Sequence, residues 1–272
     1  MTWLDLEGKV AIVTGGASGI GKAICRALAG EGACLAVADV DEEAAAATLG
    51  QLNQPQGPDH IFVKTDVTSR ESVEHLVAKT GDAFGRIDIL VNNAGINIPR
   101  LLVDPAGKEE LTEQAWDAVV EVNQKGAFLC AQATARYMIR SKRGGVIINM
   151  ASESGLEGSE GQSVYAATKG AIYSLTRSWA KELGKHGIRV AGVAPGILEA
   201  TALRSPEYER ALAYTRGKTV EQLRADYQNV SIPLGRAGTL QEVAHAVAFL
   251  ASDRAGYIHG TVINISGGKS RA

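Results

Sequence analysis

The sequence lacks three features: an excess of basic residues, a long apolar run and a paired set of cysteines. Its 28 Lys and Arg residues nearly balance 30 Asp and Glu residues, and a net charge of −2 gives no electrostatic reason to expect nucleic acid or an anionic membrane as partner. The longest apolar runs, such as residues 146–148, have the length of a strand and are far too short to span a membrane. The three cysteines, Cys25, Cys34 and Cys130, are scattered and odd in number, which indicates reduced, mostly buried thiols.

The first residues also lack the pattern of a signal peptide, because an acid, Asp5, comes early and no basic and apolar segment is found there. No internal repeat, low-complexity tract or interdomain linker divides the 272 residues. An apolar fraction of 45% is ordinary for a globular protein with a full core. We therefore expect one domain over residues 1–272 and a cytoplasmic location.

Short apolar runs alternate with amphipathic stretches of helical length along the whole chain. The candidate strands are residues 10–14, 34–38, 61–65, 87–91, 146–150, 190–193 and 261–265. Continuous apolar strands separated by helices indicate a parallel sheet that is covered by helices on both faces. The sequence therefore predicts an α/β fold.

Two longer connections, residues 95–107 and 198–232, interrupt this alternation. The second has a helical periodicity of its own. Both follow the carboxyl ends of predicted strands, which is the edge where ligands bind in open α/β sheets. Long excursions in compact domains are usually functional, so we expect a substrate loop or lid at about 198–232.

The glycine-rich segment TGGASGIG, residues 14–21, lies between the first predicted strand and the first predicted helix. Glycines at this junction let the backbone turn tightly and approach a pyrophosphate at a helix N-terminus, where free N–H groups favour anions. A plain strand–helix turn is the alternative. The residues assigned here to a dinucleotide cofactor are Gly15, Ser18, Gly19, Ile20 and Gly21.

Asp39 ends the second predicted strand, eighteen residues beyond Gly21. A carboxylate at this place can accept both hydroxyls of the adenosine ribose and would repel a 2′-phosphate. Asp41 adds negative charge, and Ser18 stands before Gly19 where a basic residue would favour a phosphate. The pattern favours NAD over NADP, although Asp39 could instead cap the helix that begins near Asp41.

Two further strand ends carry residues that could meet the adenine and its ribose. Each strand end would be an ordinary turn on its own, and it is the order of the two along the chain that supports a cofactor site. The residues assigned to the cofactor are Asp66, Val67, Asn92, Ala94 and Gly95.

Twelve residues separate Ser152 from Tyr165, and three separate Tyr165 from Lys169. Tyr165 and Lys169 share one face of a predicted helix. An ammonium about 4 Å from the phenol contributes roughly 4 kcal/mol, so we expect Lys169 to lower the pKa of Tyr165 by about three, into a range useful for acid–base catalysis. Ser152 could hold a substrate oxygen, and Asn123, in a predicted helix over about 121–131, could anchor a water beside Lys169. Any one of these could be an ordinary surface residue, but all four together are improbable by chance.

Taken in order, these motifs resemble the short-chain dehydrogenase/reductase family over nearly the whole chain. The resemblance implies a single Rossmann-like domain with a doubly wound parallel sheet, a homotetramer and a nicotinamide cofactor. It further implies that Tyr165 moves the proton, Ser152 steadies the carbonyl, Lys169 holds the nicotinamide ribose and Asn123 completes a proton relay. The same resemblance assigns Pro195, Gly196 and Ile197 to the cofactor.

One position departs from the family pattern. Members often carry a threonine five residues after the proline of Pro195-Gly196, where this chain has Ala200. Thr201 could serve instead.

Four segments on the predicted substrate side resemble one subfamily, the sorbitol-6-phosphate 2-dehydrogenases. They are residues 99–104, 123–126, 152–163 and 195–199. This resemblance implies a polyol or sugar-phosphate substrate. The candidate substrate residues are Asn97, Ser152, Glu153, Ser154 and Gln162. A phosphate needs cations, and the two excursions offer Arg100, Arg204, Arg216 and Lys218. The alternative is that these four are solvated loop residues.

Three rival functions remain to be weighed. The first is another dehydrogenase of the family, such as a polyol dehydrogenase or a 3-oxoacyl-thioester reductase. The reductase should prefer NADPH, and Asp39 argues against that preference. A non-catalytic NAD-sensing protein should lack Tyr165 or Lys169, and both are present. A metal-dependent alcohol dehydrogenase needs a ligand pattern, but the five histidines are dispersed and no cysteine pairs with them, so we expect no metal.

Overall fold

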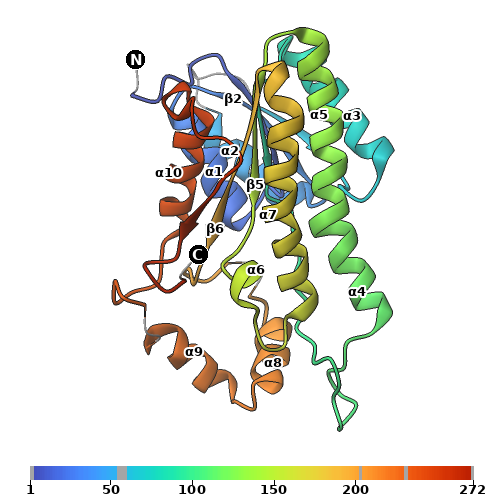
Figure 1. The fold of residues 1–272 in the computed structure, drawn as a ribbon, viewed down its shortest axis with the longest axis vertical. Coiled ribbons are helices and arrows are strands. Elements are labelled where there is room, and N and C mark those ends of the chain that lie inside the picture. Colours follow the sequence, from blue (N-terminus) through green and yellow to red (C-terminus); the bar gives the residue numbers. More distant parts are fainter. Residues whose placement is uncertain (1–2, 54–59, 202–203, 230–231, 271–272) are drawn as a thin grey trace.

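The computed structural model describes residues 3–53, 60–201, 204–229 and 232–270 (Figure 1). These residues form a seven-stranded, all-parallel sheet of order β3-β2-β1-β4-β5-β6-β7. The strands are β1 (Val10–Thr14), β2 (Cys34–Asp39), β3 (Ile61–Lys64), β4 (Ile89–Asn92), β5 (Gly145–Met150), β6 (Ile188–Pro195) and β7 (Val262–Ile265). The strand order reverses between β1 and β4, and this switch point is where such sheets bind ligands. The predicted α/β fold is confirmed.

Helices connect the strands and cover the sheet on both faces. They are α1 (Gly19–Gly30), α2 (Glu42–Leu52), α3 (Arg70–Phe84), α4 (Glu113–Val120), α5 (Ala127–Ser141), α6 (Ser154–Glu157), α7 (Ser163–Leu183), α8 (Pro206–Thr215), α9 (Val220–Asn229) and α10 (Leu240–Ala251). In Figure 1, α1 and α10 lie on one side of the sheet, and α3, α5 and α7 lie on the other.

The apolar strands are explained by this double cover. In β1, Ala11 and Val13 join the core under α1 and α10, whereas Ile12 points to the core under α3, α5 and α7. All three side chains are fully buried. Because both faces are dry, the strand has no polar alternation, and that is the pattern that predicted a parallel sheet.

The segment around Asn123 differs from the ordinary helix that the sequence predicted. A π-helical stretch, Glu121–Gly126, joins α4 to α5. The side chain of Asn123 accepts from the backbone N–H of Ile96 (2.8 Å) and donates to the Ile96 carbonyl (2.9 Å). These long-range bonds hold the widened turn in place, and such turns occur frequently at functional sites.

The two predicted excursions pack against each other beyond the carboxyl edge of the sheet. The second contains α8 and α9, which lie at the bottom of Figure 1; its residues 202–203 and 230–231 lie outside the described part of the chain. Asp104, in the first excursion, accepts a hydrogen bond from the phenol of Tyr214 on α8 (3.0 Å). Within the residues that the structure describes, no helix is long and apolar enough to span a membrane.

Candidate active site

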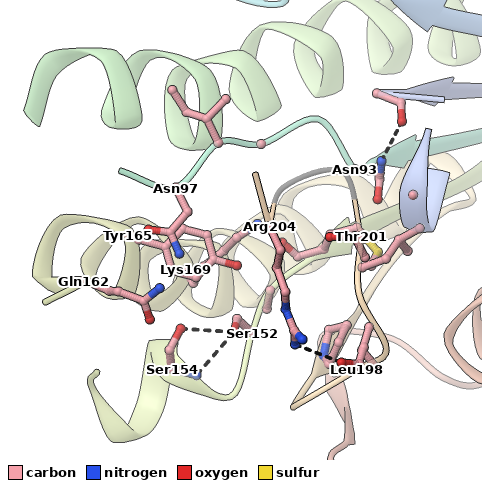
Figure 2. A pocket seen from close by; sticks show the side chains of 18 of the residues that line it. Asn93, Asn97, Ser152, Ser154, Gln162, Tyr165, Lys169, Leu198, Thr201 and Arg204 are labelled. Atoms are coloured by element: carbon pink, nitrogen blue, oxygen red, sulfur yellow. Dashed lines mark hydrogen bonds between the residues drawn. The ribbon is translucent and has the colours of Figure 1, made fainter. Parts of the chain in front are cut away.

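A cavity of about 800 Å³ runs along the carboxyl edge of the sheet, from the glycine turn to α8 and α9 (Figure 2). Most of the residues predicted for the site line it. They are Gly15, Ser18, Gly19, Ile20, Gly21, Asp39, Asp66, Val67, Ala94, Gly95, Asn97, Ser152, Glu153, Ser154, Gln162, Tyr165, Lys169, Pro195, Gly196 and Ile197. The structure therefore gathers in one cavity segments that are far apart in the sequence.

Two predicted residues, Asn92 and Asn123, are not part of the cavity wall. The amide of Asn92 points into the protein, where it donates to Asn149 Oδ1 (3.0 Å) and to the Ala127 carbonyl (3.2 Å). Its neighbour Asn93 lines the cavity instead. Successive side chains at a strand end face opposite sides, and the motif by itself did not reveal which of the two asparagines faces the ligand edge.

The glycine turn has the geometry of a phosphate cradle. Gly15 adopts a φ of +63°, and a Cβ on Gly21 would lie 2.0 Å from the Gly15 carbonyl oxygen, so no side chain fits there. Helix α1 begins immediately after Ser18, whose side chain makes no capping hydrogen bond, and its first turn has no acidic residue. Its N–H groups are thus available to an anion, which fits the pyrophosphate of a dinucleotide.

The carboxylate of Asp39 lines the cavity at the end of β2. One oxygen accepts from the backbone N–H of Ala17 (3.0 Å), and the other accepts from the N–H of Val40 (2.8 Å). The cap of α2 is Asp41, which accepts from the N–H of Ala44 (3.0 Å). The alternative that Asp39 is this helix cap is therefore wrong.

Tyr165 and Lys169 lie on the face of α7 that borders the cavity, opposite Ser152 (Figure 2). The ammonium of Lys169 donates to the carbonyl of Met150 (2.7 Å) and lies 5.6 Å from the centroid of the Tyr165 ring. A Cβ built on Gly95 would lie 3.2 Å from Asn123 Oδ1 and 3.7 Å from the Lys169 nitrogen. The four predicted catalytic residues are thus grouped around one end of the cavity, with Asn123 behind its wall.

Burial shifts the pKa values of Tyr165 and Lys169. It raises the pKa of Tyr165, and a hydrogen bond with Ser152 acts in the opposite direction. It lowers the pKa of Lys169 from 10.5 to about 8. The expectation that Lys169 lowers the pKa of Tyr165 by about three is therefore wrong. The removal of the phenol from water is the largest effect on its pKa, and it raises that pKa.

Two buried oxygen atoms on the substrate side make no hydrogen bond among the described residues, Asn97 Oδ1 and Glu153 Oε2. Both side chains line the cavity. Buried acceptors of this kind are normally satisfied, so a ligand with hydroxyl groups would complete them.

The structure separates the four basic residues of the excursions into two pairs. Arg204 and Arg216 line the cavity, whereas Arg100 and Lys218 do not. Arg100 forms an ion pair with Glu109 (2.7 Å), and Lys218 forms one with Asp226. The sequence left all four open as phosphate ligands, and the structure reduces them to two.

Sequence reasoning missed several residues of the cavity wall. Lys269, near the end of the chain, lines the cavity and its ammonium contacts Glu153 Oε1 (2.6 Å). Tyr208 of α8 lines it as well. Thr201, which the sequence had offered in place of Ala200, also lines the cavity, and Ala200 does not. No local sequence pattern indicates that Lys269 or Tyr208 lines the cavity, because tertiary packing alone brings both side chains there.

Comparisons with known proteins agree with this fold. A sequence model described as short chain dehydrogenase matches residues 9–211. The chain is 55% identical to a sorbitol-6-phosphate 2-dehydrogenase of Klebsiella pneumoniae, with 99% of both chains covered. It is 41% identical to a 3-oxoacyl-acyl-carrier-protein reductase, FabG, of Thermotoga maritima, over 97% of this chain and 99% of the relative. Among solved structures, a levodione reductase superposes with a TM-score of 0.86 at 34% identity, with 98% of this chain and 99% of that chain covered.

The protein is thus an oxidoreductase that acts on a CH–OH group with a nicotinamide cofactor. It belongs to the short-chain dehydrogenase family.

The buried ammonium of Lys169 should make protein stability depend on pH. Because its pKa is about 8 when folded and 10.5 when exposed, the unfolded chain holds the proton between these values and the folded protein does not. Lys169 should therefore contribute a rise in the free energy of unfolding with pH, by up to about 1.4 kcal/mol per pH unit, and this contribution should be lost as pH falls from 10.5 through 8. Above pH 9 the buried thiols of Cys25 and Cys130, whose pKa burial raises to about 12, act in the opposite direction. Urea unfolding of the ligand-free protein and of Lys169→Met across this window measures the Lys169 contribution as the difference between their slopes. The matched control is Lys181→Met, an exposed lysine on the same helix, which should keep the rise. Equal slopes in Lys169→Met and in the unmodified protein would contradict the expectation.

Proposed function

We propose that this chain is an NAD-dependent sorbitol-6-phosphate 2-dehydrogenase. It oxidises C2 of D-sorbitol 6-phosphate to the ketone of D-fructose 6-phosphate, and near neutral pH the reverse reduction is favoured because oxidation releases a proton. The observation that carries the proposal is the 55% identity to the Klebsiella pneumoniae enzyme, which extends over 99% of both chains. Two arginines in the cavity wall, Arg204 and Arg216, provide supporting chemistry for a phosphorylated substrate.

NAD is the proposed cofactor. The glycine turn, residues 15–21, would hold its pyrophosphate, and Asp39 would accept the adenosine ribose hydroxyls and disfavour a 2′-phosphate. Asp66, Val67 and residues 94–95 would border the adenine side, and residues 195–197 the nicotinamide. When bound, the nicotinamide ring supplies the acceptor for the hydride that leaves C2.

The proton is transferred by a side chain of the protein. Tyr165 takes the proton of the C2 hydroxyl as the carbonyl forms, and returns it in the reverse direction. Ser152, bonded to Tyr165, holds the substrate oxygen, and Asn97, Glu153, Ser154 and Gln162 are placed to bind further hydroxyls.

Lys169 has two tasks in this proposal. It holds the nicotinamide ribose, and as a cation 5.6 Å from the centroid of the Tyr165 ring it offsets part of the rise that burial causes in the pKa of the phenol. A water held by Asn123 would connect its ammonium to solvent as a proton relay.

Within one NAD-binding domain, the segment at about 198–232 acts as the substrate loop or lid, since it contributes Tyr208 of α8, Tyr227 of α9, and Arg204 and Arg216 on either side of α8 to the cavity wall. Thr201 replaces the missing carboxamide contact. A homotetramer in the cytoplasm is proposed from the family resemblance.

A 3-oxoacyl-thioester reductase is the second candidate, favoured by the 41% identity to the Thermotoga maritima reductase. It should prefer NADPH, and the carboxylate of Asp39 in the cavity wall argues against that preference. A non-catalytic NAD-sensing protein would not require Tyr165 and Lys169 together at the cavity.

A substrate panel tests the proposed function. Rates at 340 nm are measured for D-fructose 6-phosphate, D-fructose and acetoacetyl-CoA, each with NADH and with NADPH. A charge-assisted contact of about 1.5–3 kcal/mol to the phosphate predicts a kcat/KM at least about tenfold higher for D-fructose 6-phosphate than for D-fructose. Equal values for these two sugars would leave a polyol dehydrogenase, and a preference for acetoacetyl-CoA would favour the second candidate.

The carboxylate of Asp39 should determine the choice of cofactor. Asp39→Ala should weaken NAD binding and relax discrimination against NADP, because it removes the acceptor for the ribose hydroxyls and the repulsion of a phosphate. The control is Asp41→Asn, which keeps a capping side chain on α2 and should keep NAD preference. A higher kcat/KM with NADP than with NAD in the unmodified enzyme would refute the proposal of NAD.

The phenol oxygen of Tyr165 should be required for turnover. Tyr165→Phe should retain the fold and NADH binding but lose about 10²–10⁴-fold in kcat, the usual contribution of a general acid–base. Tyr137→Phe, on α5 and outside the cavity wall, is the matched control and should stay fully active. If Tyr165→Phe kept more than about a tenth of the activity, proton transfer would have to be assigned to another group.

A further inference from the structure

Four cationic side chains line the cavity in the described part of the chain, and two of them, both arginines away from the reacting end, lack a carboxylate partner. Lys169 lies beside the reacting end, and Lys269 is bonded to Glu153. Arg204 and Arg216 form no ion pair with any described carboxylate. Unpaired guanidinium groups in a cavity wall are suited to an anionic ligand, because each presents five N–H donors in a fixed plane.

Arg216 is bound on one side only. Its Nη2 donates to the hydroxyl of Ser159 (3.2 Å), which in turn donates to Gln162 Oε1 (2.6 Å). The amide nitrogen of Gln162 donates to the phenol of Tyr208 (2.7 Å). This chain of hydrogen bonds orients Arg216 and leaves its other donors for a ligand.

The position of Arg216 is set by the end of α8, which it follows directly. There the phenol of Tyr214 bonds both carboxylate oxygens of Asp104 (3.0 Å each). Thr215 packs so tightly on Gly161 that a Cβ there would lie 2.1 Å from the Thr215 hydroxyl oxygen. The guanidinium therefore extends from a fixed point of the wall.

Arg204 precedes α8 and is held differently. Its guanidinium lies 4.1 Å from the centroid of the Tyr227 ring and donates to the carbonyl of Leu198 (2.8 Å). Arg204 and Arg216 both oppose the rise in the pKa of Tyr227 that burial causes, so both guanidinium groups lie within electrostatic range of this phenol. The two arginines thus belong to one patch around Tyr227.

The patch lies close to the proposed site of proton transfer. The phenol of Tyr208, which lines the cavity, interacts electrostatically with Tyr165 and with Arg204, so it lies near both regions. One carboxylate of the wall, Asp226, borders the patch, but it is paired with Lys218, which offsets its charge.

We infer that Arg204 and Arg216 bind the phosphoryl group of the substrate, at the end of the cavity that α8 and α9 close. This inference rests on the proposed sugar-phosphate substrate. The dianion would be held by donors from both guanidinium groups while C2, at the other end of the carbon chain, lies at Tyr165 and Ser152. The site exists only because α8 is anchored to the first excursion.

The test compares two substrates within each variant, so that a general loss of folding or cofactor binding cancels. Arg204→Met and Arg216→Met should each lower kcat/KM for D-fructose 6-phosphate by about ten- to a hundredfold, with little change for D-fructose. The matched control is Arg210→Met, because Arg210 is exposed on α8, between the two arginines in the chain, and pairs with Glu207. It should leave both substrates unchanged.

Inorganic phosphate provides a second measurement. It should compete with D-fructose 6-phosphate in the unmodified enzyme, and its inhibition constant should rise in both arginine variants but not in Arg210→Met. NADH binding, followed by fluorescence, should be the same in all four proteins.

The outcomes distinguish this assignment from the proposed function. An unmodified enzyme that uses both sugars equally contradicts the sugar-phosphate function itself. In another outcome, the unmodified enzyme prefers D-fructose 6-phosphate over D-fructose while Arg204→Met or Arg216→Met keeps the same preference. That result overturns the assignment of the substituted arginine alone. A variant that loses both substrates in equal proportion also overturns it, because the side chain would then be structural.

Discussion

The close approach of two strand ends, β1 and β4, is the constraint on which the rest of the site depends. The hydroxyl of Thr14 donates to the Val91 carbonyl (3.3 Å) and accepts from the N–H groups of Asn93 (3.0 Å) and Ala94 (3.1 Å). The amide of Asn93 donates to the carbonyls of Thr14 (3.0 Å) and Gly15 (3.1 Å). These bonds join the glycine turn to the segment after β4, so that both lie at the switch point of the sheet, where ligands bind in folds of this kind.

The chemistry at this edge is governed by burial more than by pairs of charges. Tyr165 and Lys169 are both withdrawn from water, which raises one pKa and lowers the other toward the physiological range. A lysine with a pKa near 8 is costly to keep charged in a folded protein, and its bond to the Met150 carbonyl offsets part of that cost. Such perturbed groups are typical of functional sites.

Much of the fold and of the reacting group was predictable from local pattern. The apolar run of β1 required two dry faces, and the spacing of Tyr165 and Lys169 put both on one helical face. The exact form of the segment around Asn123 was not predictable, because its π-helical turn is held by bonds to Ile96, which lies 27 residues away.

The sequence by itself determined the pattern of apolar strands, the glycine turn and the spacing of the candidate catalytic residues Tyr165 and Lys169, because each depends on neighbours within a few positions. Only the tertiary structure decided that Asn93 faces the cavity in place of Asn92, and that Lys269 joins its wall. It also decided which arginines face inward. Arg100 is drawn away by Glu109, while Arg216 is placed by the packing of α8 on another loop. Such choices depend on contacts between distant segments, and no local spacing in the chain encodes them.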